Sequence, residues 1–495
     1  MNLTMLLEMA ADGFGERVLV GRRAEGLTAG DLRRAALRGA ELVAAAEAEA
    51  IVYVAVNGPA FPVALFAAAY AGVPLVPLNF RLGEEQLHDL LAKHPGALMI
   101  VDPSAEALLA DGGARARTTD QWLAETTGGA EVEPGFVESD APAVIIYTSG
   151  TTSAPKGVLL RHANLTSYVF GTVEFASAGE DEAALVSVPP YHIAAVANVI
   201  SNLFAGRRTI VLDRFEPSDW LGTVRSEEIT SALVVPTMLA RIVDYEGDRS
   251  APSLRNLAYG GAPMPAPVIR RAMEIWREVN FVNAYGLTET SSTVALLSPD
   301  DHRAAFESTD PFVRVRLGSV GRAVPGVEIE IRNEGAAVGP GQRGRIWISG
   351  EQVSAEYAGV GRVVDERGFF DTRDEGFLDE EGYLFVGGRT DDTIIRGAEN
   401  IAPAEIENVF YRHDAVSDVA VIGIPDEEWG QRIVAVVVLH AGASATSEEL
   451  RDFVRGTLRS SKTPDEIVFW HELPRTETGK LVRRNVVAQF RSECV

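Results

Sequence analysis

Strand-like and helix-like patterns alternate along most of this chain, and that alternation constrains its fold more than any other feature of the sequence. Two helical patterns, with apolar residues at helical spacing, cover residues 28–48 and 59–72. Apolar strand patterns follow them and return later, at 51–56, 74–78, 183–188, 209–212 and 232–235. Strands and helices that alternate with a repeat of roughly 20 to 30 residues are typical of βαβ units. We therefore expect an α/β protein with largely parallel sheets.

The pattern changes after Gly318. Two segments in which apolar and polar residues alternate, 327–331 and 344–348, are separated by turns that contain Gly and Pro, as in antiparallel β structure. A charged turn at 388–392 then precedes a compact α+β segment of about a hundred residues. We expect this last segment to form a separate, smaller domain.

Composition limits the classes of partner. With 495 residues the chain has the length of about two to four domains. Its net charge of −25 argues against nucleic acid or an anionic membrane as a partner. The start of the chain lacks the basic segment of a signal peptide, and the longest apolar run, 61–76, is broken by Pro and Gly, so membrane insertion is not expected. Cys494 is the single cysteine, which excludes an internal disulfide and favours a frayed terminus in a reducing, cytoplasmic compartment.

Residues 147–157, Tyr-Thr-Ser-Gly-Thr-Thr-Ser-Ala-Pro-Lys-Gly, lie between the strand patterns 143–147 and 158–160. The ten residues after the tyrosine include five hydroxyl side chains, two glycines and one lysine. Backbone N–H groups, hydroxyls and an ammonium together suit a polyphosphate. The order is not that of a Walker A loop, because Lys156 is followed by Gly157 and not by Ser or Thr. Taken alone, the segment fits a phosphate-binding loop or a flexible surface turn.

Three further segments place polar groups or glycines near predicted strand ends. His192 follows the strand pattern 183–188 and is either a structural or a functional histidine. Gly260 and Gly261 allow the backbone to approach a flat ligand closely, or form a tight turn. Residues 283–289, Asn-Ala-Tyr-Gly-Leu-Thr-Glu, combine groups that can stack a base, cradle a phosphate and hold Mg²⁺.

Two charged residues stand in predicted glycine-containing loops. Asp374, in the loop 370–376, suits a sugar diol, although acidic loop clusters are usually only solvated. Lys480 ends the segment 474–480 on a glycine turn, where most lysines are ordinary surface residues. Each of these signals is weak alone, whereas their order along the chain is far more specific.

Six segments in this order resemble the motifs of the AMP-forming acyl-CoA synthetases, a superfamily that also includes adenylation domains and firefly luciferase. They are residues 147–157, 285–289, 372–374, 388–395, 401–407 and 474–480. The resemblance extends from about residue 25 to about residue 485, nearly the whole chain. Several ordered motifs over this length make chance agreement negligible.

The resemblance implies a fold and a reaction. The fold is α/β, with a large N-terminal domain (1–390) of βαβ subdomains with parallel sheets and an antiparallel β-barrel-like subdomain. A small mobile α+β domain (392–495) follows, with Asp391 as the hinge. In such enzymes a carboxylic acid attacks the α-phosphate of Mg·ATP, giving acyl-AMP and pyrophosphate, and a thiol, usually of coenzyme A, then displaces AMP. The implied cofactors are ATP, Mg²⁺ and coenzyme A.

Motif positions carry the family's roles to this chain. The implied ATP- and AMP-binding residues are Thr148, Ser149, Gly150, Thr151, Thr152, Lys156, Gly260, Gly261, Ala262, Asn283, Tyr285, Gly286, Asp374 and Arg389. The implied Mg²⁺ ligands are Glu289 and Thr151. The implied catalytic residues are Thr288, Glu289, His192 and Lys480, whose ammonium would bridge the attacking carboxylate and the α-phosphate.

The second half-reaction is implied to use another face of the small domain. After rotation at Asp391, the segment 395–400 would face the site, and Arg396 and Gly397 would flank the path of coenzyme A. The family usually has a glycine where Arg373 stands and a small residue where Arg396 stands. These differences leave open an enzyme that favours one half-reaction.

The acid pocket is implied to include Tyr191, His192, Ala195, Asn198, Thr237 and Gly261. The run 193–198, Ile-Ala-Ala-Val-Ala-Asn, has no acidic residue for an amino acid's ammonium and no arginine for a second carboxylate. Its small alanines leave room for a bulky apolar or aryl acid, with Asn198 beside a polar substituent or in the core. Three functions remain open: an acyl- or aryl-CoA ligase, an enzyme that loads the phosphopantetheine of an acyl carrier protein, and a nucleotide-binding protein without turnover. A homodimer is compatible with each.

Overall fold

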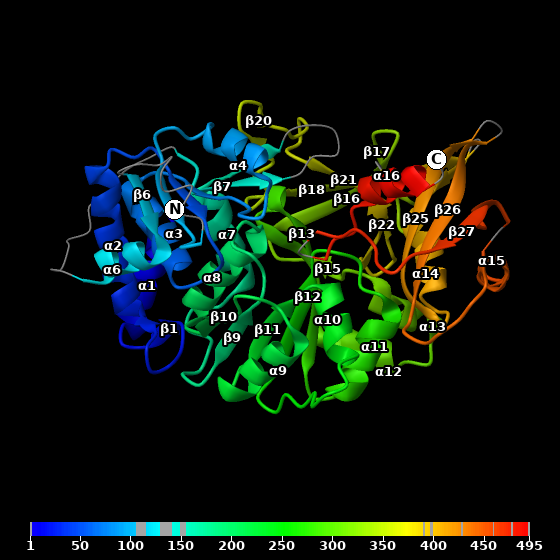
Figure 1. Ribbon diagram of the computed structural model, residues 1–495, viewed down its shortest axis with the longest axis horizontal. Coiled ribbons are helices and arrows are strands. Elements are labelled where there is room, and N and C mark those ends of the chain that lie inside the picture. Colours follow the sequence, from blue (N-terminus) through cyan, green and yellow to red (C-terminus); the bar gives the residue numbers. More distant parts are fainter. Residues whose placement is uncertain are drawn as a thin grey trace.

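The computed structural model describes residues 2–104, 115–128, 141–148, 155–389, 392–396, 399–426, 429–458, 460–476 and 479–493. Within this part of the chain, two large sheets form most of the N-terminal domain (Figure 1). Their strand orders are β20-β19-β8-β7-β4-β3-β5-β6 and β15-β14-β13-β12-β11-β9-β10-β1-β2. The central neighbours pair in parallel, which confirms the expected α/β class.

The elements of these two sheets follow the predicted alternation. The strands of the first sheet are β3 (Ile51–Val54), β4 (Leu75–Pro77), β5 (Leu98–Val101), β6 (Ala116–Thr118), β7 (Val144–Thr148), β8 (Lys156–Leu160), β19 (Glu356–Tyr357) and β20 (Gly361–Arg362). Those of the second are β1 (Val18–Val20), β2 (Leu27–Thr28), β9 (Ala183–Val186), β10 (Arg208–Val211), β11 (Ser231–Val234), β12 (Asn256–Gly260), β13 (Asn280–Leu287), β14 (Ser292–Leu297) and β15 (Arg322–Ala323). The helices are α1 (Thr4–Phe14), α2 (Ala29–Ala45), α3 (Ala60–Ala71), α4 (Glu84–Leu91), α6 (Thr119–Thr127), α7 (His162–Thr172), α8 (Ile193–Ala205), α9 (Pro217–Ser226), α10 (Pro236–Val243), α11 (Ala266–Ile275), α12 (Pro299–Glu307) and α13 (Pro311–Arg314).

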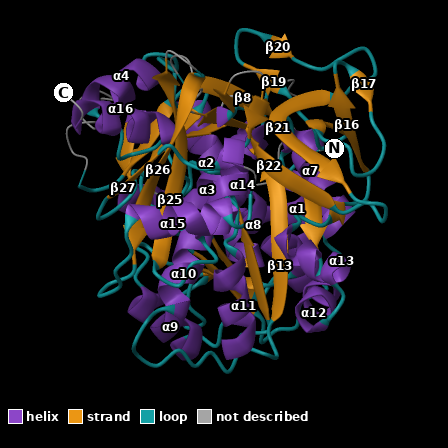
Figure 2. Cartoon of the chain, turned by 90° about the vertical axis from the view of Figure 1, so that its right-hand side faces the viewer, coloured by secondary structure: helices purple, strands orange, loops and turns teal. Residues whose placement is uncertain are grey.

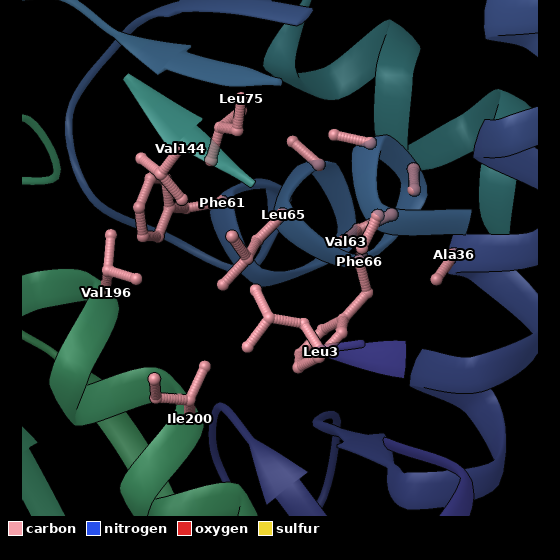
Figure 3. Close-up of a cluster of buried hydrophobic side chains, with 14 of the residues drawn as sticks. Leu3, Ala36, Phe61, Val63, Leu65, Phe66, Leu75, Val144, Val196 and Ile200 are labelled. Carbon is pink, nitrogen blue, oxygen red and sulfur yellow. The ribbon is translucent and has the colours of Figure 1, made fainter. Parts of the chain in front are cut away.

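Alternate side chains of β3 show that both faces of the first sheet are covered. Ile51 and Tyr53 belong to a core shared with α1, α2, α3 and α8, whereas Val52 and Val54 pack with α4. Figure 3 shows side chains of α3 and α8 in this shared core. The opposite face of the second sheet packs against α9, α10 and α11. Helices therefore lie between the two sheets and outside both, which explains the nearly continuous apolar strand patterns.

Local signals in the sequence set several of these boundaries. The Thr28 hydroxyl accepts the Asp31 N–H at 3.0 Å and the Asp31 carboxylate accepts the Thr28 N–H at 3.1 Å, so a capping box begins α2. Gly72 ends α3 in the left-handed conformation, at φ +68°. In the described part of the chain, no helix combines the length and apolarity that crossing a bilayer requires.

The antiparallel region forms a third sheet with the order β17-β16-β18-β21-β22. Its strands are β16 (Val327–Asn333), β17 (Ala336–Ala337), β18 (Gly344–Gly350), β21 (Phe370–Leu378) and β22 (Leu384–Arg389). The prediction that Asp374 stands in a loop is wrong, because it lies inside β21. That strand pairs with β18 on one side and β22 on the other, with a register shift in each pairing. Hydrogen bonds to both neighbours therefore keep the segment extended, although its Asp and Gly residues favour a turn.

The chain after Arg389 forms a small domain with its own core, as expected. Its elements are the hairpin β23 (Ile394–Arg396) and β24 (Glu399–Ile401), the sheet β25 (Val416–Asp426), β26 (Gly430–Leu439) and β27 (Glu466–Phe469), and helices α14 (Pro403–Phe410), α15 (Ser447–Arg455) and α16 (Arg483–Glu493). Figure 2 shows this sheet from the end of the molecule at which it lies. In Figure 1 the red segment between β27 and α16 extends toward the N-terminal domain.

Candidate active site

A cleft of about 3100 Å³ lies between the N-terminal domain and the small domain. Cationic side chains outnumber carboxylates along its described walls, although the whole chain carries a net charge of −25. The cleft is therefore a local site for anions on an acidic protein. The predicted site residues that line it are Thr148, Lys156, Tyr191, His192, Asn198, Thr237, Gly260, Gly261, Ala262, Asn283, Tyr285, Gly286, Thr288, Glu289, Asp374 and Lys480.

The β7–β8 hairpin presents the predicted phosphate side of the cleft. Thr148 and Lys156 form the last pair of this hairpin, next to the segment that connects its two strands. Lys156 is exposed, and its Nζ lies 6.0 Å from the centroid of the Tyr357 ring. The predicted phosphate ligands outside the described residues are Ser149, Gly150, Thr151 and Thr152.

Glycines allow close packing at the ends of β12 and β13. A Cβ on Gly260 would lie 2.3 Å from the Ala284 carbonyl oxygen, so only glycine fits there. Gly261 then turns the chain at φ +80°. The Asn283 amide nitrogen donates to the Ser319 carbonyl at 3.0 Å, which ties that side chain to the fold. The backbone at these strand ends lines the cleft, where a purine can approach it closely.

Asp374 is a buried carboxylate at the edge of this surface. The Tyr285 hydroxyl donates to Asp374 Oδ2 at 2.6 Å, and the Asp374 backbone pairs with Arg389 across β21 and β22. The side chain of Arg389 is outside the described residues. Arg373 adopts φ +62°, the conformation that glycine enters without strain, while its side chain is exposed. The unusual arginine therefore strains the backbone, and it lines the cleft next to Asp374.

Glu289 stands in a short 3₁₀ turn, η2 (Thr288–Thr290), immediately after β13. Its Oε1 accepts a hydrogen bond from the Tyr357 hydroxyl at 2.8 Å. Among the described residues, no group of three or more His, Cys, Asp or Glu side chains could hold a metal ion. A single carboxylate facing a phosphate site suits Mg²⁺, which usually binds through one or two carboxylates together with substrate phosphates.

The small domain brings Lys480 to the start of α8. Burial, together with the nearby Lys480 ammonium, lowers the pKa of His192 to about 4, so the imidazole is neutral at pH 7. The preceding Gly479 packs so closely that an added Cβ would lie 2.0 Å from Thr237 Oγ1 of the N-terminal domain. The small domain is therefore docked on the N-terminal domain, and this position places the predicted catalytic lysine beside the predicted acid pocket.

The turn that carries Lys480 is held on both sides. Thr476 N–H donates to the Lys480 carbonyl at 2.8 Å, and Lys480 N–H donates to the Thr476 hydroxyl at 3.0 Å. Arg475 donates to the Gly479 carbonyl at 2.6 Å and forms an ion pair with Asp418 at 2.7 Å. The lysine backbone is therefore fixed relative to the sheet of the small domain.

One face of α8 forms the wall of the predicted acid pocket. Ala194, Ala197 and Asn198 line the cleft, and the Asn198 amide nitrogen donates to the Ala194 carbonyl at 2.7 Å. Ala195 is an exception among the predicted acid-pocket residues, because its side chain is fully buried in the shared core. A helix presents residues three and four apart on one face, so Ala195 points away from the wall formed by Ala194 and Asn198.

Arg396, one of the two predicted coenzyme A residues, lies on the small domain and does not line the described cleft. Arg396 forms an ion pair with Asp465, in which Nη2 donates to Oδ1 at 2.8 Å, and its guanidinium lies 5.2 Å from the Trp429 ring centroid. The predicted hinge Asp391 and the predicted Gly397 are outside the described residues.

Two functional contacts were missed in the sequence, those of Tyr357 and Arg475. No motif marks Tyr357, which reaches Glu289 only because β19 joins the sheet beside β8. Arg475 lies in the predicted segment 474–480. Its position five residues before Lys480 is the one sequence signal that it holds the lysine turn in place.

Comparisons with known proteins agree with this geometry. The model of the AMP-binding enzyme family matches residues 7–358, and that of the AMP-binding enzyme C-terminal domain matches residues 405–480. A feruloyl-CoA synthase of Amycolatopsis sp is 36% identical over 451 residues, which cover 89% of this chain and 88% of that protein. An indoleacetate–CoA ligase of Aromatoleum aromaticum is 32% identical over 461 residues, with coverage of 89% and 88%.

Solved structures of acid–CoA ligases are also similar to this chain. The o-succinylbenzoate CoA synthetase of Bacillus subtilis, in complex with its acyl-adenylate intermediate, matches with a TM-score of 0.83 and 30% identity over 97% of each chain. The same enzyme in complex with ATP and a magnesium ion matches with a TM-score of 0.83 and 29% identity, over 98% of this chain and 99% of that chain. The chain therefore belongs to the AMP-binding enzyme family and is an AMP-forming acid–CoA ligase.

Proposed function

We propose that this ligase activates a bulky apolar or aryl carboxylic acid as acyl-AMP and transfers the acyl group to the thiol of coenzyme A. The observation that carries the proposal is the position of Lys480, which the small domain holds beside His192 in the cleft that also contains Glu289 and Asp374. An ammonium, a carboxylate for metal-bound phosphates and a carboxylate for a ribose diol are the groups that adenylation of an acid requires.

In the first half-reaction an oxygen of the acid's carboxylate bonds to the α-phosphorus of ATP, and the bond from that phosphorus to the pyrophosphate oxygen breaks. Thr148 and Lys156 are proposed to hold the β- and γ-phosphates, and Thr288 the α-phosphate. Lys480 places its ammonium where negative charge develops between the two reactants. Mg²⁺ supplies neutralisation of the phosphate charge when bound, and Glu289 is the residue placed to hold it.

His192 and Asp374 are proposed to position the two substrates. A neutral His192 can flank the acid's carboxylate without adding a second charge that competes with Lys480. Asp374, oriented by Tyr285, is placed to accept the ribose hydroxyls while the backbone at Gly260 and Gly261 faces the adenine.

In the second half-reaction the thiol loses its proton to solvent, its sulfur bonds to the carbonyl carbon of acyl-AMP, and AMP leaves. We place the required change of lid at Asp391, where the small domain rotates and turns the β23–β24 hairpin to the cleft. Arg396 and Gly397 would then flank the thiol's path. The ion pair between Arg396 and Asp465 keeps that guanidinium on the face of the small domain.

The proposed substrate class is supported by the wall of the acid pocket and by the relatives. The wall formed by Ala194, Ala197 and Asn198 carries no charge, so it favours an apolar body over an amino acid or a second carboxylate. The names of three relatives, feruloyl-CoA synthase, indoleacetate–CoA ligase and 2-succinylbenzoate–CoA ligase, all denote acids that contain an aromatic ring.

A panel of carboxylic acids tests the proposal. Pyrophosphate release should be fastest with aryl acids and slow with amino acids, and addition of free coenzyme A should yield the thioester without a carrier protein. Thioester formation only after a phosphopantetheine-bearing carrier protein is added would assign the enzyme to carrier loading. Pyrophosphate release with amino acids but not with aryl acids would refute the substrate class.

A further inference from the structure

Residues 352–358, called the strap here, connect two parts of the cleft that are far apart in the sequence. At one end of the strap, Ala355 N–H donates to the Glu289 carbonyl at 3.0 Å. The buried Gln352 amide nitrogen donates to the Thr290 carbonyl at 3.1 Å. The strap therefore fixes the backbone of the turn that carries Glu289.

At its other end the strap joins the phosphate hairpin. Tyr357 pairs with Val158 of β8, and Ala358 N–H donates to the Gly157 carbonyl at 2.8 Å. Gly157 directly follows Lys156 in the sequence. The strap thus sets the distance between the turn that carries Glu289 and the strand that carries Lys156.

The Tyr357 side chain lies near two groups of opposite charge. Its hydroxyl donates to Glu289 Oε1 at 2.8 Å, and the centroid of its ring lies 6.0 Å from Lys156 Nζ. Lys156 and Glu289 form no ion pair with each other or with another described residue. One aromatic ring therefore contacts both the cation and the carboxylate that the proposed function assigns to the phosphates and to Mg²⁺.

We propose that Tyr357 is a positioning residue that orients the Glu289 carboxylate and keeps it from pairing with Lys156 before Mg·ATP binds. This inference rests on the proposed roles of Lys156 and Glu289. A hydrogen bond to one carboxylate oxygen leaves the other available to a metal, and a carboxylate held by the tyrosine hydroxyl is restrained from turning toward Lys156. Binding of Mg·ATP then does not have to break a salt bridge first.

Tyr357→Phe tests the orienting role, because it removes the hydroxyl and keeps the ring. We expect calorimetry to show about three- to tenfold weaker binding of a Mg²⁺-bound, non-hydrolysable ATP analogue, the effect of losing one hydrogen bond to a charged group. Binding of AMP, which lacks the β- and γ-phosphates, should not change. Equal loss of affinity for both ligands, or no loss for either, would overturn the orienting role.

Tyr383→Phe is the matched control, because its hydroxyl also donates to a carboxylate, Asp301 Oδ1 at 2.5 Å, outside the cleft wall. It should leave the affinities for the Mg²⁺-bound analogue and for AMP unchanged. A loss for the metal-bound analogue in this control as large as that in Tyr357→Phe would show that the effect is not local to Glu289.

Tyr357→Leu tests the separation of charges. With the hydroxyl and the ring removed, we expect Glu289 to turn toward Lys156 and pair with it, so binding of the metal-free ATP analogue should weaken by about tenfold or more. Adding Glu289→Gln should then restore affinity for the metal-free analogue by a larger factor than Glu289→Gln does in the presence of Tyr357. An equal factor in both backgrounds would refute the separation. Because these readouts use nucleotide binding, they hold even where the acid panel refutes the proposed substrate.

Discussion

Gly479→Ala isolates the docked position of the small domain. Gly479 has φ +73°, and an added Cβ would lie 2.0 Å from Thr237 Oγ1 and 3.1 Å from Thr237 Cβ and Cγ2. Ordinary contacts of a Cβ begin at 3.4 Å, so the loop must lift from the N-terminal domain by about an ångström. Lys480 is the next residue and must move with it.

The expected effect has two parts. The left-handed backbone conformation of alanine costs about 1–2 kcal/mol, and this part is present wherever the small domain lies. The clash with Thr237 exists only in the docked position. A displacement of about 1 Å in a reacting group can reduce a rate about 10²-fold, so we expect acyl-AMP formation to fall by about that factor.

The assay measures each half-reaction separately. ATP–pyrophosphate exchange should fall about 100-fold in Gly479→Ala, while thioester formation from supplied acyl-AMP should remain near the wild-type rate. Adding Thr237→Ala removes Oγ1 and Cγ2 and should restore part of the exchange. Gly442→Ala is the control, because Gly442 has φ +79° and nothing lies within 4 Å of its added Cβ. Equal loss of both half-reactions, or no rescue by Thr237→Ala, would refute the docking geometry.

The geometry of the site leads to four further predictions. Lys480→Met should raise the pKa of His192 above its value of about 4, because the nearby ammonium is lost, while burial still keeps it below 6.5; an NMR titration of the imidazole measures this. Because the folded state lowers this pKa, the stabilisation from neutral His192 is complete above about pH 6.5 and is lost as the pH falls toward 4. The free energy of unfolding should therefore fall more steeply between pH 6.5 and 4 in the wild type than in His192→Gln, and denaturant unfolding at a series of pH values measures this. Arg373→Gly should raise the free energy of unfolding by about 0.5–1 kcal/mol, since relief of the positive φ exceeds the added chain entropy; chemical denaturation measures this. Tyr285→Phe should lower the free energy of unfolding by about 1–3 kcal/mol and weaken AMP binding, because buried Asp374 loses a hydrogen bond; an unchanged affinity for AMP would contradict the ribose assignment.

The sequence was sufficient to predict most of the helices and strands and a set of residues that meet in the cleft. Short-range signals determine these features: alternation of strands and helices, Thr28 and Gly72 at helix ends, and glycines such as Gly260 where backbones meet. Most of the residues that the ordered motifs identified line the cleft.

The features that the sequence did not give depend on long-range packing. Asp374 reads as a loop residue, yet pairing of β21 with both neighbours makes it part of a strand. Tyr357 carries no motif, and its contact with Glu289 exists only because the strap crosses between two sheets. Ala195 was placed in the acid pocket, but the rotation of α8 turns it into the core.

The account depends most directly on Lys480 acting in only one of the two half-reactions. Lys480→Ala should lower acyl-AMP formation by about 10²–10³-fold, while thioester formation from supplied acyl-AMP and coenzyme A continues near the wild-type rate. Lys462→Ala, which removes another lysine of the small domain that binds Glu405 at 2.7 Å, serves as the control and should not separate the two steps. Equal loss of both half-reactions in Lys480→Ala, with the fold intact, would contradict the proposal that one cleft serves two steps by changing the face of its lid.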